Sequence, residues 1–178
     1  VDMSTAVAEL ADDLGARLIH ISTDAVFDGD DGMYTETDEP SPINEYGWTK
    51  LEAERSVSNV HEDSVIIRTS IYGWNATAGQ SLAEWMLSKL ESGAELPGFE
   101  DVYFTPIFTE SLSDCLLELV ESEYCGVLHV TGKERCSKHR FAQVIADVFE
   151  FDDSRVTPIS VSEAGLDAPR GKDLSLSV

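Results

Sequence analysis

Tyr46 and Lys50 lie four residues apart in the segment YGWTK, near the start of a predicted helix. Side chains at this spacing project from one face of a helix, so we expect the phenol and the ammonium to be neighbours. A free phenol ionises only near pH ~10, and a neighbouring ammonium favours the ionised form. The pair therefore predicts a proton donor to a substrate carbonyl group, with a pair on a solvated helix surface as the structural alternative.

Thr23 follows ARLIHIS, residues 16–22, a short and nearly continuous apolar segment. Such a segment is typical of a strand buried on both faces of a parallel sheet. Open α/β sheets bind their ligands at the carboxyl ends of the strands, so we expect the Thr23 hydroxyl to hydrogen-bond the same carbonyl oxygen. Asp24 is interpreted either as a substrate contact or as a carboxylate that orders the loop.

The elements that must position these residues alternate between helices and strands. Apolar residues at helical spacing predict the helices, with Gly15 and Gly93 near C-terminal caps and Ser137 as an N-cap. The predicted helices cover residues 3–14, 42–61, 81–90, 110–121 and 137–149, and the predicted strands cover residues 16–22, 64–70 and 126–132. Residues 23–41, 72–79 and 154–178 are predicted to be loops or irregular. The alternation predicts an α/β protein with a doubly wound parallel sheet.

With these segments in place, the sequence resembles the extended short-chain dehydrogenase/reductases, and within them the dTDP-4-dehydrorhamnose reductase-like sugar-nucleotide proteins. The segments that carry the resemblance are STDAVFDG (22–29), YTETDEPSPINEYGWTKLEAE (34–54), IIRTSIYG (66–73), GVLHVTG (126–132) and PRGKDLSL (169–176). The resemblance implies a Rossmann-like fold in one structural unit. Residues 1–71 would form the remainder of the nucleotide-binding domain with the catalytic triad. Residues 72–178 would form mixed sheet and helix, binding substrate mainly through residues 72–108 and the tail.

The resemblance also implies a function, the NAD(P)H-dependent reduction of a nucleotide-linked 4-keto sugar, with NADP or NAD as the cofactor. Tyr46 would supply the proton, Lys50 would assist it and hold the nicotinamide ribose, and Thr23 would orient the carbonyl group. The implied cofactor-binding residues are Ser22, Tyr46, Lys50, Ser70 and Ile71. The implied substrate-binding residues are Thr23, Asp24, Thr105, Pro106 and Arg170.

Three alternatives stay open at this point. Epimerases and dehydratases of sugar nucleotides share the triad, and the substrate pocket decides between them and a reductase. The family also contains non-catalytic sugar-nucleotide-binding or regulatory subunits. The third alternative is that the chain is a fragment with no independent activity, because it would require an upstream half.

The sequence departs from the family pattern in three respects. The family begins with a Gly-rich dinucleotide fingerprint, whereas the closely spaced glycines here, Gly29 and Gly32, lie in an acidic loop. We therefore expect the first strands and helices of the nucleotide domain to be missing and the dinucleotide to bind weakly. Ala25 and Ile71 stand where rhamnose reductases usually have Tyr and Trp. An Arg-Pro pair near the end is Ala-Pro here, which leaves Arg170 as the candidate for a nucleotide phosphate.

The charge is strongly negative. Thirty-four Asp and Glu against 12 Lys and Arg give a net charge of −22 over 178 residues. Such a surface repels phosphate backbones and anionic lipids, so we expect neither a nucleic-acid nor a membrane partner. The scattered acidic residues and the five lysines predict a halophilic protein, with an ordinary acidic cytosolic protein as the alternative. The expected partners are a nucleotide-sugar substrate and another protein chain, either in a homo-oligomer or associated through the exposed edge of the sheet.

Cysteines and histidines give no sign of a metal or redox site. Cys115, Cys125 and Cys136 are odd in number and lack Cys-x-x-Cys spacing, which predicts reduced thiols and a cytoplasmic location. The histidines show no metal-ligand spacing, so we expect no bound metal. The sequence shows no apolar segment as long as a membrane span and no export signal.

The net charge of −22 generates a prediction about salt. Self-repulsion destabilises the folded chain, and the screening length falls from about 10 Å at about 0.1 M salt to about 3 Å at about 1 M. We expect the thermal unfolding midpoint to rise between these KCl concentrations, as measured by circular dichroism. A midpoint that stays constant would contradict the halophilic interpretation.

Overall fold

The computed structural model describes residues 1–76 and 81–178, so the predicted loop at 72–79 lies partly outside the described residues. The helices are α1 (Asp2–Asp13), α2 (Glu45–Val60), α3 (Leu82–Glu91), α4 (Thr109–Glu121) and α5 (Lys138–Val148), with short 3-10 helices η1 (Asp24–Val26), η2 (Asp153–Arg155) and η3 (Val161–Glu163). The strands are β1 (Ile19–Ile21), β2 (Val65–Arg68), β3 (Ile71–Tyr72), β4 (Leu96–Phe99), β5 (Tyr103–Phe104), β6 (Ile107–Phe108), β7 (Gly126–His129), β8 (Cys136–Ser137) and β9 (Val156–Ile159). In the described residues, no helix is both long and apolar enough to cross a membrane.

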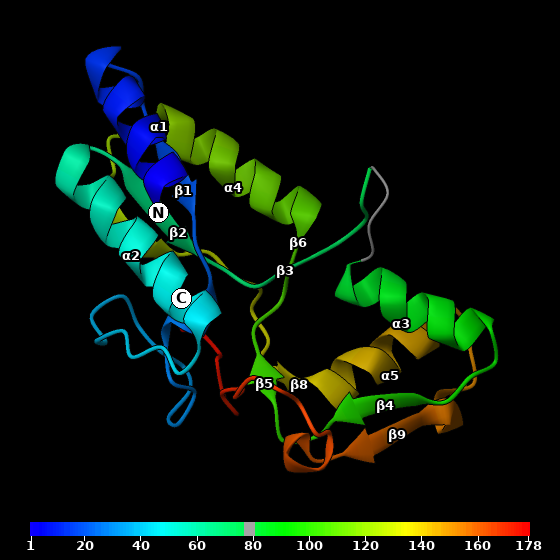
Figure 1. The fold of residues 1–178 in the computed structure, drawn as a ribbon. Helices are drawn as coiled ribbons and strands as arrows, with labels where there is room; N and C mark the ends of the chain where they lie inside the picture. The colour runs from blue at the N-terminus through cyan, green and yellow to red at the C-terminus, as the bar shows by residue number, and fades with distance from the viewer. Residues whose placement is uncertain (77–80) are drawn as a thin grey trace.

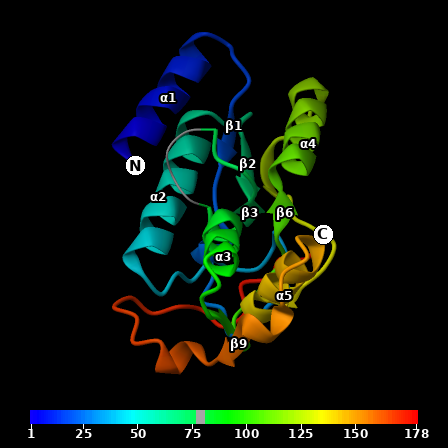
Figure 2. The ribbon, with the colours of Figure 1, turned by 90° about the vertical axis from the view of Figure 1, so that its right-hand side faces the viewer.

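A parallel sheet with the strand order β1-β2-β7 forms one end of the molecule. Side chains alternate across a strand, so Val65 and Ile67 pack against Leu112 of α4, whereas Ile66 lies with Leu51 of α2. Figure 2 shows α1 and α2 on one side of this sheet and α4 on the other. The layers match the predicted α/β fold with parallel strands, which is therefore confirmed.

A second unit with its own core lies at the other end of the molecule (Figure 1). Here β4 and β9 pair in parallel, and α3 and α5 pack beside them. The buried side chains at its centre come from all four elements and include Met86, Leu96, Ile145 and Val156. Two short strand pairs, β3 with β6 and β5 with β8, lie between this unit and the parallel sheet.

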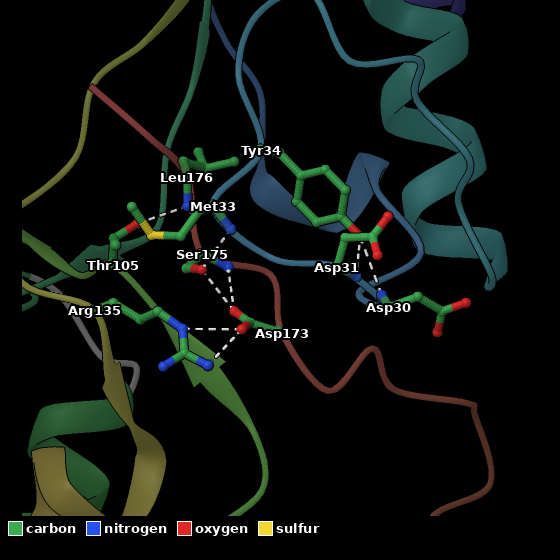
Figure 3. A network of polar contacts seen from close by, with 9 residues as sticks. All are labelled: Asp30, Asp31, Met33, Tyr34, Thr105, Arg135, Asp173, Ser175 and Leu176. Atoms are coloured by element: carbon green, nitrogen blue, oxygen red, sulfur yellow. Dashed lines mark hydrogen bonds and ion pairs between the residues drawn. The ribbon is translucent and has the colours of Figure 1, made fainter.

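The C-terminal tail crosses back from the second unit toward the loop after η1. The Asp173 carboxylate accepts two hydrogen bonds from Arg135 at 2.9 and 2.5 Å and one from the Ser175 hydroxyl at 2.6 Å. Ser175 Oγ in turn accepts the Met33 N–H at 2.8 Å (Figure 3). At Gly29, where φ is +84°, a Cβ would lie 2.5 Å from Gly171 Cα, so the two chain segments cross in direct backbone contact.

The five predicted helices are confirmed, and so is the predicted N-cap at Ser137. Ser81 forms a capping box with Glu84, and the Ser137 hydroxyl accepts the Arg140 N–H. The prediction of an irregular tail was wrong for residues 156–159, which form β9. This strand is short and pairs with residues about 60 positions away in sequence, a partner that no local pattern indicates.

A buried ion pair connects α2 to the sheet. Arg68 on β2 donates to the Glu54 carboxylate from Nε at 3.1 Å and from Nη2 at 2.8 Å, and the Ser22 hydroxyl donates to the same carboxylate. The side chains of Arg68 and Glu54 are 5% and 4% exposed. Because water is largely excluded, each charge depends on the other for stabilisation. Ser22 precedes Thr23, and Glu54 lies eight residues after Tyr46, so the pair fixes the two predicted catalytic segments relative to each other.

Replacing Glu54 by Gln should leave the Arg68 charge buried without a counter-ion. We expect the free energy of unfolding to fall by about 3–5 kcal/mol, as measured by urea denaturation in molar KCl.

The matched control is Glu52→Gln on the same helix. Glu52 pairs with Arg55 at 2.7 Å, but both side chains are more than half exposed. Exposed pairs contribute about 0–1 kcal/mol, so this change should be small. Equal losses in the two variants would contradict the structural role given to the buried pair.

Candidate active site

The turn after β1 places a hydroxyl and a carboxylate at the carboxyl edge of the sheet. The Thr23 hydroxyl accepts the Ala25 N–H at 3.2 Å and donates to the Asp24 carboxylate at 3.0 Å. The backbone N–H of Asp24 donates to the Thr69 carbonyl at 3.4 Å, which ties the turn to the end of β2. Thr23 and Asp24 are both buried, so the protein holds their positions closely.

The first turns of α2 present the phenol and the ammonium. Asn44 caps the helix by accepting the Gly47 N–H at 2.9 Å. Lys50 Nζ lies 5.7 Å from the centroid of the Tyr46 ring, and the Tyr46 side chain is half-exposed. The two groups therefore lie side by side on one face of the helix, with the phenol accessible to a ligand.

Gly47 allows α2 to approach the turn that carries Thr23. A Cβ at Gly47 would lie 2.2 Å from the Ala25 carbonyl oxygen, closer than any real side chain could lie. Sterics therefore explain why a glycine stands between Tyr46 and Trp48. The lack of a side chain lets the helix that carries the Tyr46 phenol pack against the turn that carries the Thr23 hydroxyl.

These segments form one wall of a cavity of about 910 Å³ between the parallel sheet and the second unit. The polar part of the lining includes Thr23, Asp24, Tyr46, Ser70, Lys138 and Arg170. The opposite wall is largely apolar and is contributed by α3, β4, β5 and the tail, with Trp85, Phe99, Tyr103 and Phe104 as its aromatic members. A volume of this size accommodates a ligand as large as a nucleotide derivative.

Two ionisable groups in the cavity have shifted pKa values. Burial raises the pKa of Asp24, while the charge of Lys138 and the hydroxyls of Thr23 and Ser70 oppose the shift. Burial lowers the pKa of Lys138 to about 8, while the charge of Asp24 opposes the shift. Since about 8 lies above neutral pH, the Lys138 side chain is mostly an ammonium under ordinary conditions.

The structure brings most of the expected substrate and catalytic residues together. Thr23, Asp24, Tyr46, Ser70 and Arg170 all line the cavity. Lys50 lies beside the Tyr46 ring and is not among the described lining residues.

Four other expected site residues lie outside the described lining of this cavity. Ser22 is buried and donates its hydroxyl proton to Glu54. Ile71 lies half-exposed on β3. Thr105 is buried and its hydroxyl accepts the Leu176 N–H at 3.1 Å, and Pro106 follows it on the same segment (Figure 3 shows Thr105 with the tail). The Thr105 and Pro106 segment thus anchors the tail instead of lining the cavity.

Sequence reasoning missed Lys138, Trp85 and Phe104 as residues that line the cavity. Trp85 packs against the core of the second unit, and it also lines the cavity. A signal for Lys138 was present in the sequence. It directly follows the N-cap Ser137, and a cation in the first turn opposes the helix dipole, which makes that position unusual for a purely structural lysine.

One end of a dinucleotide cofactor fits the residues present. The half-exposed Tyr46 phenol, the adjacent Lys50 ammonium and the Ser70 segment supply hydrogen-bonding groups at the carboxyl edge of the sheet, which suits a ribose and a nicotinamide. In residues 1–76 and 81–178, no helix begins directly after a Gly-rich turn that would hold a pyrophosphate. The same residues contain no group of three or more His, Cys, Asp or Glu side chains placed to hold a metal ion.

Comparisons with known proteins give relatives along the whole chain. The chain is 35% identical over 170 residues to the probable low-salt glycan biosynthesis reductase Agl14 of Haloferax volcanii. This alignment covers 93% of this chain and 56% of that protein. It is 32% identical over 187 aligned positions to methionine adenosyltransferase 2 subunit beta of Bos taurus. This alignment covers 99% of this chain and 55% of that protein. The chain thus spans about half the length of the curated relatives it matches.

Solved structures are also similar to this chain along nearly its whole length. The dTDP-4-dehydrorhamnose reductase of Bacillus anthracis, in complex with NADP, superposes with a TM-score of 0.90 at 30% identity, over 98% of this chain and 61% of that chain. A dTDP-4-dehydrorhamnose reductase of Clostridium acetobutylicum gives 0.89 at 32% identity, over 97% and 61%. The model of the RmlD substrate binding domain matches residues 1–178. This chain therefore belongs to the family of the RmlD substrate binding domain and has the α/β fold of the dTDP-4-dehydrorhamnose reductases.

Proposed function

We propose that this chain binds a nucleotide-linked 4-keto sugar and donates the proton in its NAD(P)H-dependent reduction. The observation that carries the proposal is the convergence of Thr23, Asp24, Tyr46 and Ser70 on one cavity that also has an apolar wall. The polar end suits a keto sugar, and the aromatic wall suits a nucleobase. Family membership supports the reaction class.

Tyr46 is the proposed acid. Its phenol is accessible from the cavity and would donate its proton to the carbonyl oxygen of the sugar. The Lys50 ammonium, 5.7 Å from the ring centroid, stabilises the negative charge that this transfer leaves on the phenol oxygen. When bound, NADPH or NADH supplies the hydride to the carbonyl carbon. Tyr46, Lys50 and Ser70 would hold its ribose and nicotinamide end.

Thr23 orients the carbonyl group in this proposal. Its hydroxyl proton now lies on a hydrogen bond to Asp24. A carbonyl oxygen that reaches Thr23 would compete for that proton, and the Asp24 carboxylate would keep the Thr23 side chain turned toward the cavity. Arg170, which lines the cavity from the tail, would contact a phosphate of the nucleotide.

Tyr46→Phe removes the acidic hydroxyl and keeps the ring. We expect the rate of NADPH oxidation with dTDP-4-dehydrorhamnose to fall by about 10²- to 10⁴-fold, the usual effect of losing a general acid. The measurement is absorbance loss of NADPH at saturating sugar nucleotide and at millimolar cofactor, because the described residues lack a pyrophosphate site.

The control is Tyr124→Phe. The Tyr124 hydroxyl donates to the Val127 carbonyl, with an oxygen–oxygen distance of 2.6 Å, and Tyr124 is not among the residues that line the cavity. Its rate should match that of the parent. A parent that oxidises NADPH while Tyr46→Phe keeps the parent rate would exclude Tyr46 as the acid. Net NADPH oxidation also separates a reductase from an epimerase or dehydratase, in which the hydride returns to the sugar and no cofactor is consumed.

A second candidate function is that of a binding subunit of a larger enzyme. It is favoured by the relatives named methionine adenosyltransferase 2 subunit beta, of which the Bos taurus protein is 32% identical. This candidate predicts that the parent binds nucleotide or partner without turnover and that Tyr46→Phe binds equally well. Calorimetric titration of both proteins with NADPH and dTDP, run beside the turnover assay, separates the two functions.

A further inference from the structure

Lys138 carries a charge into the cavity that no described acidic side chain pairs with directly. It is the first residue of α5, and its ammonium lies 3.0 Å from the centroid of the Phe104 ring. Among the described residues, Lys138 Nζ makes neither a hydrogen bond nor an ion pair within 4.0 Å. Asp24, on the turn after β1, influences its charge from a greater distance. The ammonium is therefore available to a ligand.

This position is unfavourable for a lysine that serves the fold alone. The N-terminus of a helix carries partial positive charge, so a cation in the first turn is repelled. Burial adds a second cost, and the Arg170 charge a third. The contact with the Phe104 ring offsets part of these costs. A group held under such conditions is typical of a binding site.

The cavity also differs in charge from the rest of the protein. Asp24 and Glu45 on its lining are balanced by Lys138 and Arg170, whereas the whole chain carries a net charge of −22. A neutral cavity repels an anionic ligand less than the acidic surface around it does. With its separate donors and acceptors, it suits a polar ligand that also bears negative charge, such as a sugar nucleotide.

We propose that Lys138 is a specificity-determining residue that donates a hydrogen bond to an oxygen of the sugar ring, while Asp24 accepts one from a neighbouring hydroxyl. The proposal rests on the proposed function and adds the residues that distinguish the sugar from the rest of the nucleotide. The Lys138 ammonium and the Asp24 carboxylate, which both line the cavity, form a donor and an acceptor, the combination that two adjacent hydroxyl groups require.

The sugar is favoured over the phosphates as the partner of Lys138 because of what surrounds the ammonium. Its charge interacts with Asp24, which is hydrogen-bonded to Thr23 at the site of the proposed carbonyl group. The Asp24 carboxylate would repel a phosphate, whereas the Arg170 guanidinium, which also lines the cavity, would attract one. Lys138 thus lies at the sugar end of the cavity.

The test compares dTDP-glucose with dTDP as calorimetric probes of the parent and of Lys138→Met. Methionine keeps the length of the side chain beside Phe104 and removes the charged donor. We expect the affinity for dTDP-glucose to fall by about 10- to 100-fold, and that for dTDP by less than about threefold. Lys138→Arg retains charged donors and should recover part of the lost affinity for dTDP-glucose.

Lys133→Met is the matched control, because Lys133 is exposed on the turn after β7 and does not line the cavity. It should bind both probes like the parent. Equal losses of both probes in Lys138→Met would assign Lys138 to the phosphates and overturn the proposal, and unchanged binding of both would overturn it as well. A parent that binds neither probe would instead refute the proposed function, and the role of Lys138 with it. Thermal unfolding of each variant verifies that it is folded.

Discussion

The buried pair of Glu54 and Arg68 holds the site together. It joins the middle of α2 to the end of β2, and its third member, Ser22, immediately precedes Thr23. Apolar residues of similar volume would stabilise a core at least as well, since a buried ion pair loses much of its solvation. The pair also orients the helix. Because the Glu54 carboxylate accepts hydrogen bonds from Arg68 and Ser22, it sets the rotation of α2 about its axis, and hence the direction in which Tyr46 and Lys50 point.

The second contact that shapes the site is steric. Gly47 allows the α2 backbone to touch the carbonyl of Ala25. The ion pair and the glycine act at two points along the same helix, so both its rotation and its distance from the turn are set. The phenol is therefore positioned by groups that do not themselves contact a substrate.

The cavity opposite this helix is completed by chain segments far apart in sequence. The tail crosses the loop after η1 where Gly29 meets Gly171, and the Arg135–Asp173 pair holds it there. This crossing brings Arg170 to the cavity, while α5 brings Lys138. In a protein with a net charge of −22, a cavity whose own charges balance is a local exception that favours an anionic ligand.

The sequence alone indicated the five helices, the three strands of the parallel sheet and several candidate residues of the polar wall. Helical spacing, caps such as Ser137, and three apolar segments are local signals, so they predicted the five helices and the parallel sheet. The spacing of Tyr46 and Lys50 likewise placed them on one face. Tertiary structure decided the rest, because it depends on which distant segments pack together. The pairing of β9 with β4, the burial of Thr105 under the tail and the position of Lys138 beside Phe104 arise from contacts between residues far apart in sequence, which no local pattern encodes.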